Sequence, residues 1–123
     1  MIVRHGDRET DQTCSNGATV TMGTYNIETN KIGSVTCDVT IIDLGNGATG
    51  TGKFVCGFHR YGGAASTVID STDALIPLKT PGVLAGSSVS FSQSSNTITV
   101  SFTGVAGRNI RVICLFQLTT ITD

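Results

Sequence analysis

The segment from residue 88 to residue 118 alternates between apolar and polar side chains with the period of a β-strand. In the stretch 88–93, Val89 and Phe91 share one face and serines occupy most of the other. The stretch 97–103 repeats the pattern, with Ile98, Val100 and Phe102 on one face. Turn-forming residues at 94–96 join the two stretches, so the sequence predicts a β-hairpin here.

The next predicted strand, residues 110–118, is apolar on both faces. One face carries Ile110, Val112, Cys114, Phe116 and Leu118. On the other face, Ile113 and Leu115 stand between Arg111 and Gln117. A strand with one face in water is expected to carry polar residues on that face, so these two apolar residues need an explanation. Two explanations stay open: this face meets other copies in a closed threefold assembly, or the strand's own chain covers both of its faces. We assign Arg111, Ile113, Leu115 and Gln117 to a predicted oligomer interface.

Length and composition point to one all-β domain. The 123 residues are 39% hydrophobic and 14% charged, with a formal net charge of -1, which gives no electrostatic reason to expect nucleic acid as a partner. We find no helical stretch, signal peptide or membrane-spanning run, so we expect no membrane insertion and synthesis in the cytoplasm. Residues 1–16 are polar and unpatterned and are predicted to be a linker, and residues 17–123 are predicted to be the domain.

Further strands are predicted along the domain by β-branched and aromatic residues between turn signals. They cover residues 18–22, 25–28, 34–44, 54–59 and 66–78, with a glycine-rich loop at 45–52. About eight strands at short spacing, without crossover helices, predict an antiparallel β-sandwich that is jelly-roll-like.

Three of the four cysteines share strand faces with apolar residues: Cys37, Cys56 and Cys114. Buried free thiols are common in cytoplasmic proteins, so we expect reduced cysteines, with at least one disulfide as the alternative.

The segment Gly47–Lys53 imitates a phosphate-binding loop. Such a loop needs Ser or Thr directly after the lysine and a helix behind it, but Phe54 stands there and the following residues alternate as a strand. We therefore expect a flexible hairpin loop and no nucleotide.

Neither histidine, His5 nor His59, belongs to a metal-binding pattern, and we expect no metal and no cofactor. Asp70 and Asp73 could form an acid and base pair for glycoside hydrolysis, but their setting is typical of a turn. We therefore predict no catalytic residue.

A candidate glycan-binding group lies at the end of the strand predicted over 54–59. His59, Arg60 and Tyr61 place an imidazole, a guanidinium and an aromatic ring beside two glycines, and sugars stack on aromatic faces. Because the chain has no Trp, Tyr25 and Tyr61 are the candidate stacking rings. The alternative is an ordinary surface turn.

The C-terminal residues resemble a known family. Asn96–Val112, with its Thr-Gly turn and its Asn-Ile-Arg, and the ending Gln117–Thr120 look like the end of bacteriophage tailspike and tail-fibre proteins. The resemblance covers about the last quarter of the chain, and the chain departs from it at Ile113 and Cys114, where an aromatic residue is expected.

The resemblance implies a non-catalytic distal domain of a phage tail, located in the virion and assembled in the host cytoplasm. Its implied partners are two further copies in a homotrimer, an upstream β-helix of the same tailspike, and host-surface polysaccharide. Alternatives are a stand-alone carbohydrate-binding or adhesin module, a capsid-decoration sandwich and, more remotely, a fragment of a glycan-degrading enzyme.

Overall fold

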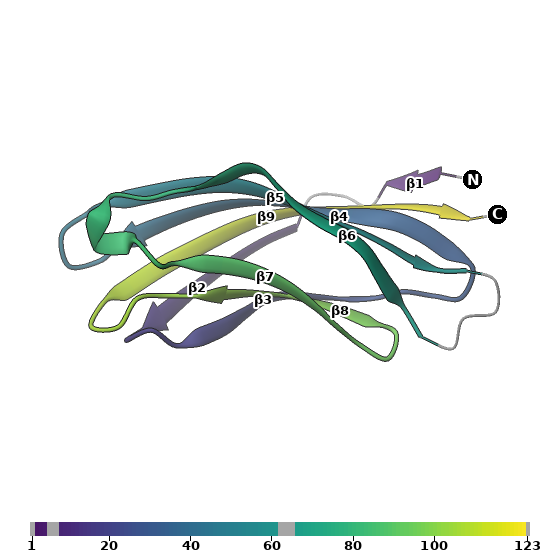
Figure 1. The fold of residues 1–123 in the computed structure, drawn as a ribbon, viewed down its shortest axis with the longest axis horizontal. Coiled ribbons are helices and arrows are strands. Elements are labelled where there is room, and N and C mark those ends of the chain that lie inside the picture. Colours follow the sequence, from purple (N-terminus) through teal and green to yellow (C-terminus); the bar gives the residue numbers. More distant parts are fainter. Residues whose placement is uncertain (1, 5–7, 62–65, 123) are drawn as a thin grey trace.

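The chain folds into two antiparallel β-sheets packed face to face (Figure 1). The computed structural model describes residues 2–4, 8–61 and 66–122. The prediction of an antiparallel β-sandwich is confirmed, and no helix among the described residues is long and apolar enough to cross a membrane. The strands are β1 (Ile2–Arg4), β2 (Arg8–Ser15), β3 (Thr19–Asn26), β4 (Lys31–Asp43), β5 (Thr49–Arg60), β6 (Val68–Lys79), β7 (Ser88–Ser94), β8 (Thr97–Thr103) and β9 (Asn109–Thr122), with a short 3₁₀ turn η1 (Gly82–Leu84) before β7.

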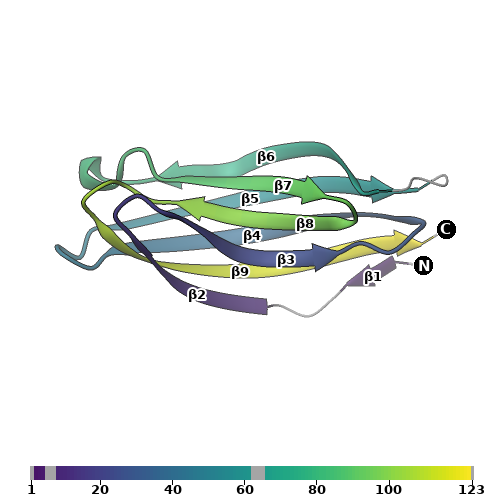
Figure 2. The same ribbon diagram turned by 90° about the horizontal axis from the view of Figure 1, so that it is seen from below.

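The larger sheet, sheet A, has the order β1-β9-β4-β5-β6, and β2 pairs with the same edge of β9 as β1. The smaller sheet, sheet B, has the order β3-β8-β7 and covers one face of sheet A (Figure 2). The pairings of β2 with β9 and of β3 with β8 are nested one inside the other, as in a jelly roll. The meander β4-β5-β6 departs from that arrangement because it stays within sheet A. Both ends of the described chain lie at the same end of the sandwich (Figure 1).

The core lies between the two sheets and takes one face of each. Strand β8 alternates strictly, with Ile98, Val100 and Phe102 fully buried. Opposite them, β9 buries Val112 and Phe116. Burial of each such side chain contributes about 1.5–3 kcal/mol, so the alternation fixes which face of each strand points inward.

Residues 8–15 correct the prediction of an N-terminal linker, because they form β2. This strand pairs with β9 along its whole length, from Arg8 opposite Phe116 to Ser15 opposite Asn109. Most side chains of β2 are exposed on both faces and only Cys14 is buried, so the sequence carries no alternation. Backbone pairing and not side-chain burial defines this strand.

The glycine-rich loop predicted at 45–52 is also shorter than expected, because β5 begins at Thr49. A Cβ atom on Gly52 would lie 3.0 Å from the Cα of Leu78, and one on Gly50 would lie 2.9 Å from the carbonyl oxygen of Lys79. These glycines therefore allow close approach to the end of β6. The segment that imitates a phosphate-binding loop leads into a strand, so it lacks the helix N-terminus that binds phosphate.

One bulged strand, β3, replaces the two strands predicted at 18–22 and 25–28. Its register with β8 shifts between Thr21 and Gly23, which directs both Met22 and Tyr25 into the core. A regular alternation cannot place two residues three positions apart on one face, so the bulge changes which residues are buried.

Candidate functional site

The outer face of sheet A, which points away from sheet B, carries the predicted oligomer interface. Strand β9 is central in this sheet, between β2 and β4, but sheet B covers only its inner face. On the outer side, Arg111 and Leu115 are exposed and Ile113 and Gln117 are half-buried. Because Leu115 is 40% exposed and Ile113 is half-buried, the chain's own residues cover the outer face of this strand only in part.

Leu115 belongs to a row of side chains that crosses sheet A. The row runs through Asp38 on β4 and Lys53 on β5 to Ile76 on β6, which is 49% exposed. The amine of Lys53 lies 3.8 Å from the carboxylate of Asp38, so the two charges in the row face each other. A shallow hollow of about 210 Å³ opens beside Leu115 and is lined by Thr36, Asp38, Lys53, Leu115, Phe116 and Gln117.

A second row crosses the same face near the chain ends. It contains Val68, His59, Ile32 and Ile121, from β6, β5, β4 and β9. The three aliphatic side chains are exposed by 38%, 42% and 46%, respectively. Exposed apolar side chains from β4, β6 and β9 therefore share one uncovered face, which is unusual for a sheet that remains in water.

Arg111 is already paired within the chain. Its guanidinium donates to both carboxylate oxygens of Asp11 on β2, with the Nε contacts at 3.0 and 3.2 Å. The hydrogen bond from Arg111 lowers the pKa of Asp11 below its usual value, and the positive charge acts in the same direction. Two ion pairs, Asp11 with Arg111 and Asp38 with Lys53, thus lie near Leu115 on this face, and Glu9 of β2 stands directly opposite Leu115.

The structure separates the residues of the predicted glycan group. The Nδ1 atom of His59 lies 2.7 and 2.8 Å from the two carboxylate oxygens of Asp70, on the outer face of sheet A. Arg60 turns the other way, and its Nη1 donates to the carbonyl oxygen of Ile27 at 2.9 Å. Tyr61 follows β5 and is 41% exposed. The glycines at 62 and 63 lie outside the described residues.

Tyr25 is not available as a stacking ring, which corrects that part of the prediction. It is 8% exposed, and its ring contacts Phe116 edge-on at 5.8 Å between centroids. The guanidinium of Arg8 lies over the ring at 5.0 Å. Desolvation in this position raises the pKa of Tyr25 to about 12. The bulge in β3 explains the difference, because it turns this side chain into the core.

Asp70 and Asp73, the two aspartates considered as an acid and base pair, have different surroundings on β6. Asp70 binds His59 at a bulge in the pairing of β5 with β6, and Asp73 lies opposite Val55. The sequence did not reveal the pairing of His59 with Asp70. Within the described part of the chain, no group of three or more His, Cys, Asp or Glu side chains is placed to hold a metal ion.

All four cysteines, including Cys14, are buried free thiols. The hydrogen bond to Cys114, followed by burial, raises the pKa of the Cys37 thiol. Burial raises the pKa of Cys56 to about 11, with a smaller contribution from the charge of Asp70. Neutral thiols with raised pKa values are weak nucleophiles, so Cys37 and Cys56 act as small core residues.

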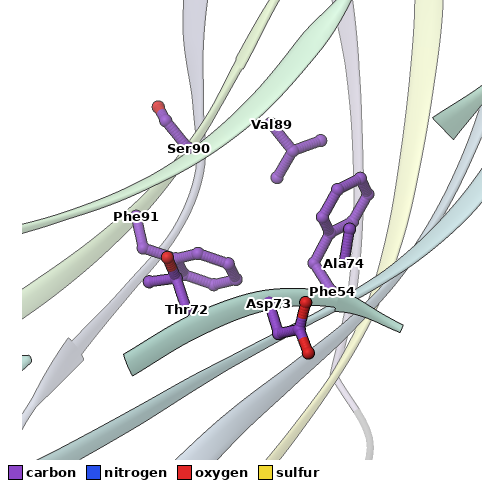
Figure 3. A pocket seen from close by; sticks show the side chains of 7 residues that line it. All are labelled: Phe54, Thr72, Asp73, Ala74, Val89, Ser90 and Phe91. Carbon is purple, nitrogen blue, oxygen red and sulfur yellow. The ribbon is translucent and has the colours of Figure 1, made fainter. Parts of the chain in front are cut away.

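A cavity that sequence reasoning missed opens where the free edges of the two sheets meet. It has a volume of about 410 Å³ and lies between β5 and β6 on one side and β7 on the other (Figure 3). We call it the seam pocket, and its lining residues are Phe54, Thr72, Asp73, Ala74, Val89, Ser90 and Phe91. These residues lie up to 37 positions apart in sequence, so no local pattern could have joined them.

Comparison with known proteins gives little support of its own. No family model matches the chain, and no curated protein matches it. Among solved structures, the tailspike protein of Acinetobacter baumannii phage AM24 is similar with a TM-score of 0.44 and 8% sequence identity. The match covers 95% of this chain and 26% of that chain, so the chain spans about a quarter of the tailspike's length. A match at this level adds no weight to a function.

Proposed function

We propose that this chain is a non-catalytic module of a phage tailspike or tail fibre that forms a homotrimer through the outer face of sheet A. The observation that carries the proposal is the exposed apolar surface along β9, centred on Leu115. The resemblance of residues 96–120 to the ends of tailspike proteins supports the phage context and the place in the virion. An upstream β-helix and host polysaccharide remain the partners that this context implies.

The energetics of the face favour association. Complete burial of an exposed aliphatic side chain contributes about 1.5–3 kcal/mol, and Leu115, Ile76, Ile32 and Ile121 are each 40–49% exposed. Four of the charged neighbours are paired within the protomer, Asp11 with Arg111 and Asp38 with Lys53, while Glu9 stands opposite Leu115. Such pairs bring little net charge into an interface, which reduces the electrostatic cost of covering them.

A closed symmetric assembly suits this surface better than an open one. Each protomer of a closed ring covers its exposed patches completely, whereas an open chain of protomers leaves them available for continued growth. Three protomers are the number that the tailspike resemblance implies.

Light scattering of the purified chain at micromolar concentration tests the proposal. The wild type is expected to have the mass of a trimer, and its melting temperature is expected to rise with protein concentration. Leu115→Lys is expected to be a folded monomer, because the charge cannot be buried at the interface. The matched control is Ser92→Lys on β7, an exposed position of sheet B, which is expected to stay trimeric. A monomeric wild type would refute the trimer.

Contact with host glycan is a second candidate function, and the seam pocket is the observation that favours it. The pocket provides half-buried aromatic side chains beside a hydroxyl-rich surface, which the group at residues 59–61 does not.

A further inference from the structure

The seam pocket is a gap in an otherwise closed junction between the sheets. At one end, the backbone amide of Thr67 donates to the carbonyl oxygen of Ser95 at 2.9 Å, and that of Ile69 donates to Oε1 of Gln93 at 2.7 Å. At the other end, η1 connects β6 to β7 and buries Leu84. Between these closures β6 and β7 are not paired, so the side chains behind them remain open to solvent.

Apolar side chains form the walls of this gap. Phe54 from β5 and Phe91 from β7 are both half-buried, and their rings flank the cavity together with Val89 and Ala74 (Figure 3). Thr72 lies beside the ring of Phe91 (Figure 3). A volume of about 410 Å³ falls in the range of about 300–1,000 Å³ that is typical of small-ligand sites.

The charges around the pocket narrow the class of ligand. No Lys or Arg is among the lining residues, and the one charged residue, Asp73, lies at the rim with its carboxylate directed away from Phe91 and Val89 (Figure 3). An anionic ligand would therefore find no counter-charge. An uncharged ligand with an apolar face and several hydroxyl groups suits both the aromatic walls and the polar rim.

The mouth of the pocket continues onto a surface made almost entirely of hydroxyl groups. Ser90 lies at the rim with its side chain turned toward the outer face of sheet B (Figure 3), opposite Ser101 of β8, which pairs in turn with Thr21 of β3. Every outward side chain of these three strands is Ser, Thr or Asn: Thr19, Thr21, Thr24, Asn26, Ser88, Ser90, Ser92, Ser94, Thr97, Thr99, Ser101 and Thr103. An uncharged polyhydroxylated chain can exchange hydrogen bonds across this face without displacing any ion pair.

We propose that the seam pocket binds one uncharged hexose residue of a glycan whose neighbouring residues lie over the outer face of sheet B. The sugar would stack its C–H face on Phe91 or Phe54 and direct hydroxyl groups to Thr72 and the rim. The inference rests on the proposed function only for the source of the glycan, the host surface. It requires neither the trimer nor the group at residues 59–61.

Nuclear magnetic resonance titration of the isotope-labelled full chain tests the proposal. The probes are the methyl glycosides of glucose, galactose, mannose and N-acetylglucosamine, with methyl glucuronide as the anionic probe, each up to high millimolar concentration. At least one neutral probe is expected to shift the amide signals of residues 72–74 and 89–91, and the glucuronide is expected to leave them unchanged.

A variant that fills the pocket provides the second measurement. Ala74 is exposed on β6, so Ala74→Leu adds volume at the wall without creating a cavity, and its own spectrum reports whether it is folded. It is expected to weaken sugar binding about tenfold or more, equivalent to about 1.4 kcal/mol. The matched control, Ala85→Leu, places the same change at an exposed position outside the pocket and is expected to bind as the wild type does.

Three results would overturn the proposal: no shift with any neutral probe, shifts centred on residues 59–61 instead, or binding that Ala74→Leu leaves unchanged. Light scattering of the same samples separates this proposal from the trimer. A monomer that binds sugar in the pocket would refute the trimer alone, and a trimer that binds none of the probes would refute the sugar site alone.

Discussion

The two outer faces of the sandwich differ in composition although the two inner faces are built alike. The outer face of sheet B presents only Ser, Thr and Asn. The outer face of sheet A mixes exposed aliphatic side chains, such as Leu115 and Ile76, with charges paired inside the protomer. Both faces are open to solvent in the single chain. The difference therefore does not arise from the packing of the core.

The difference between the two outer faces is clearest in the two central strands, β8 and β9. Strand β8 alternates buried apolar residues with half-buried Ser and Thr, which is sufficient for a central strand of a sandwich. Strand β9 buries an equivalent inner face and also places Ile113 and Leu115 outside. Strand β8 thus shows that a central strand of this sandwich can form without a second apolar face. We interpret that of β9 as serving contacts beyond the protomer.

The largest expected effect comes from comparing the inner and outer faces of β9. Phe116→Ala removes a fully buried ring and is expected to lower the free energy of unfolding by about 3–5 kcal/mol at every protein concentration. Ile113→Ala is expected to have an effect that grows with protein concentration, because it removes contacts of the proposed assembly in addition to contacts within the protomer. Urea denaturation at low and high protein concentration measures both. An equal loss for Ile113→Ala at the two concentrations would contradict the assignment of this face.

A smaller effect is expected at alkaline pH, because inward groups of both sheets have raised pKa values. Burial raises the pKa of Cys56 in sheet A from 9.0 to about 11, and that of Tyr25 in sheet B from 10.0 to about 12. Because both values are higher in the folded state, the stability that they contribute is complete below pH 9 and is lost as pH rises through about 11 and 12.

Urea midpoints measured from neutral to alkaline pH check this expectation, with tyrosinate absorbance as the signal for Tyr25. In Cys56→Ala the decline is expected to be smaller than in the wild type, because only Cys37 and Tyr25 then contribute to it. A wild-type midpoint that is flat up to pH 12 would show that neither group is desolvated as the structure indicates.

The smallest effect is expected from the ion pair on the outer face of sheet A. The pKa of Asp11 is lowered by Arg111, so its contribution to stability is present above the usual aspartate pKa of 3.8 and is lost as pH falls through the lowered value. Both groups are exposed, so added salt is expected to weaken the effect. In Arg111→Ala, the pKa of Asp11 measured by magnetic resonance is expected to return toward 3.8. An unchanged pKa would mean that the pair does not form in solution.

The sequence predicted best those strands in which burial of one face dictates residue choice. The strand predicted at 97–103 has the observed bounds of β8, and those predicted at 88–93 and 110–118 lie within β7 and β9. Strand β2 was not predicted, because most of its side chains are exposed on both faces and the sequence therefore shows no alternation. Only its backbone pairing defines this strand. The start of β5 was not predicted, because Gly50 and Gly52 are typical of a loop. In the structure these two glycines leave room for the end of β6, which packs close to their backbone.

The candidate sites were harder to predict because they depend on irregularities and on long-range proximity. The bulge in β3 buries Tyr25, and a bulge beside Phe58 brings Asp70 to His59. Neither irregularity has a signal in the local sequence. The seam pocket depends on how far the two sheet edges separate. By contrast, the outer apolar residues Ile113 and Leu115 were visible in the sequence, because a regular strand keeps its alternation without any tertiary information.

The position of β9 also bears on how the chain folds during synthesis. The pairing partner of β1 and β2 is β9, and Asp11 and Arg111 are separated by 100 residues. While the ribosome is making the middle of the chain, these early strands have no edge to join, although the β4-β5-β6 meander can already form. Closing of sheet A therefore waits until β9 has left the exit tunnel, and residues 8–15 stay open to chaperones and proteases until then.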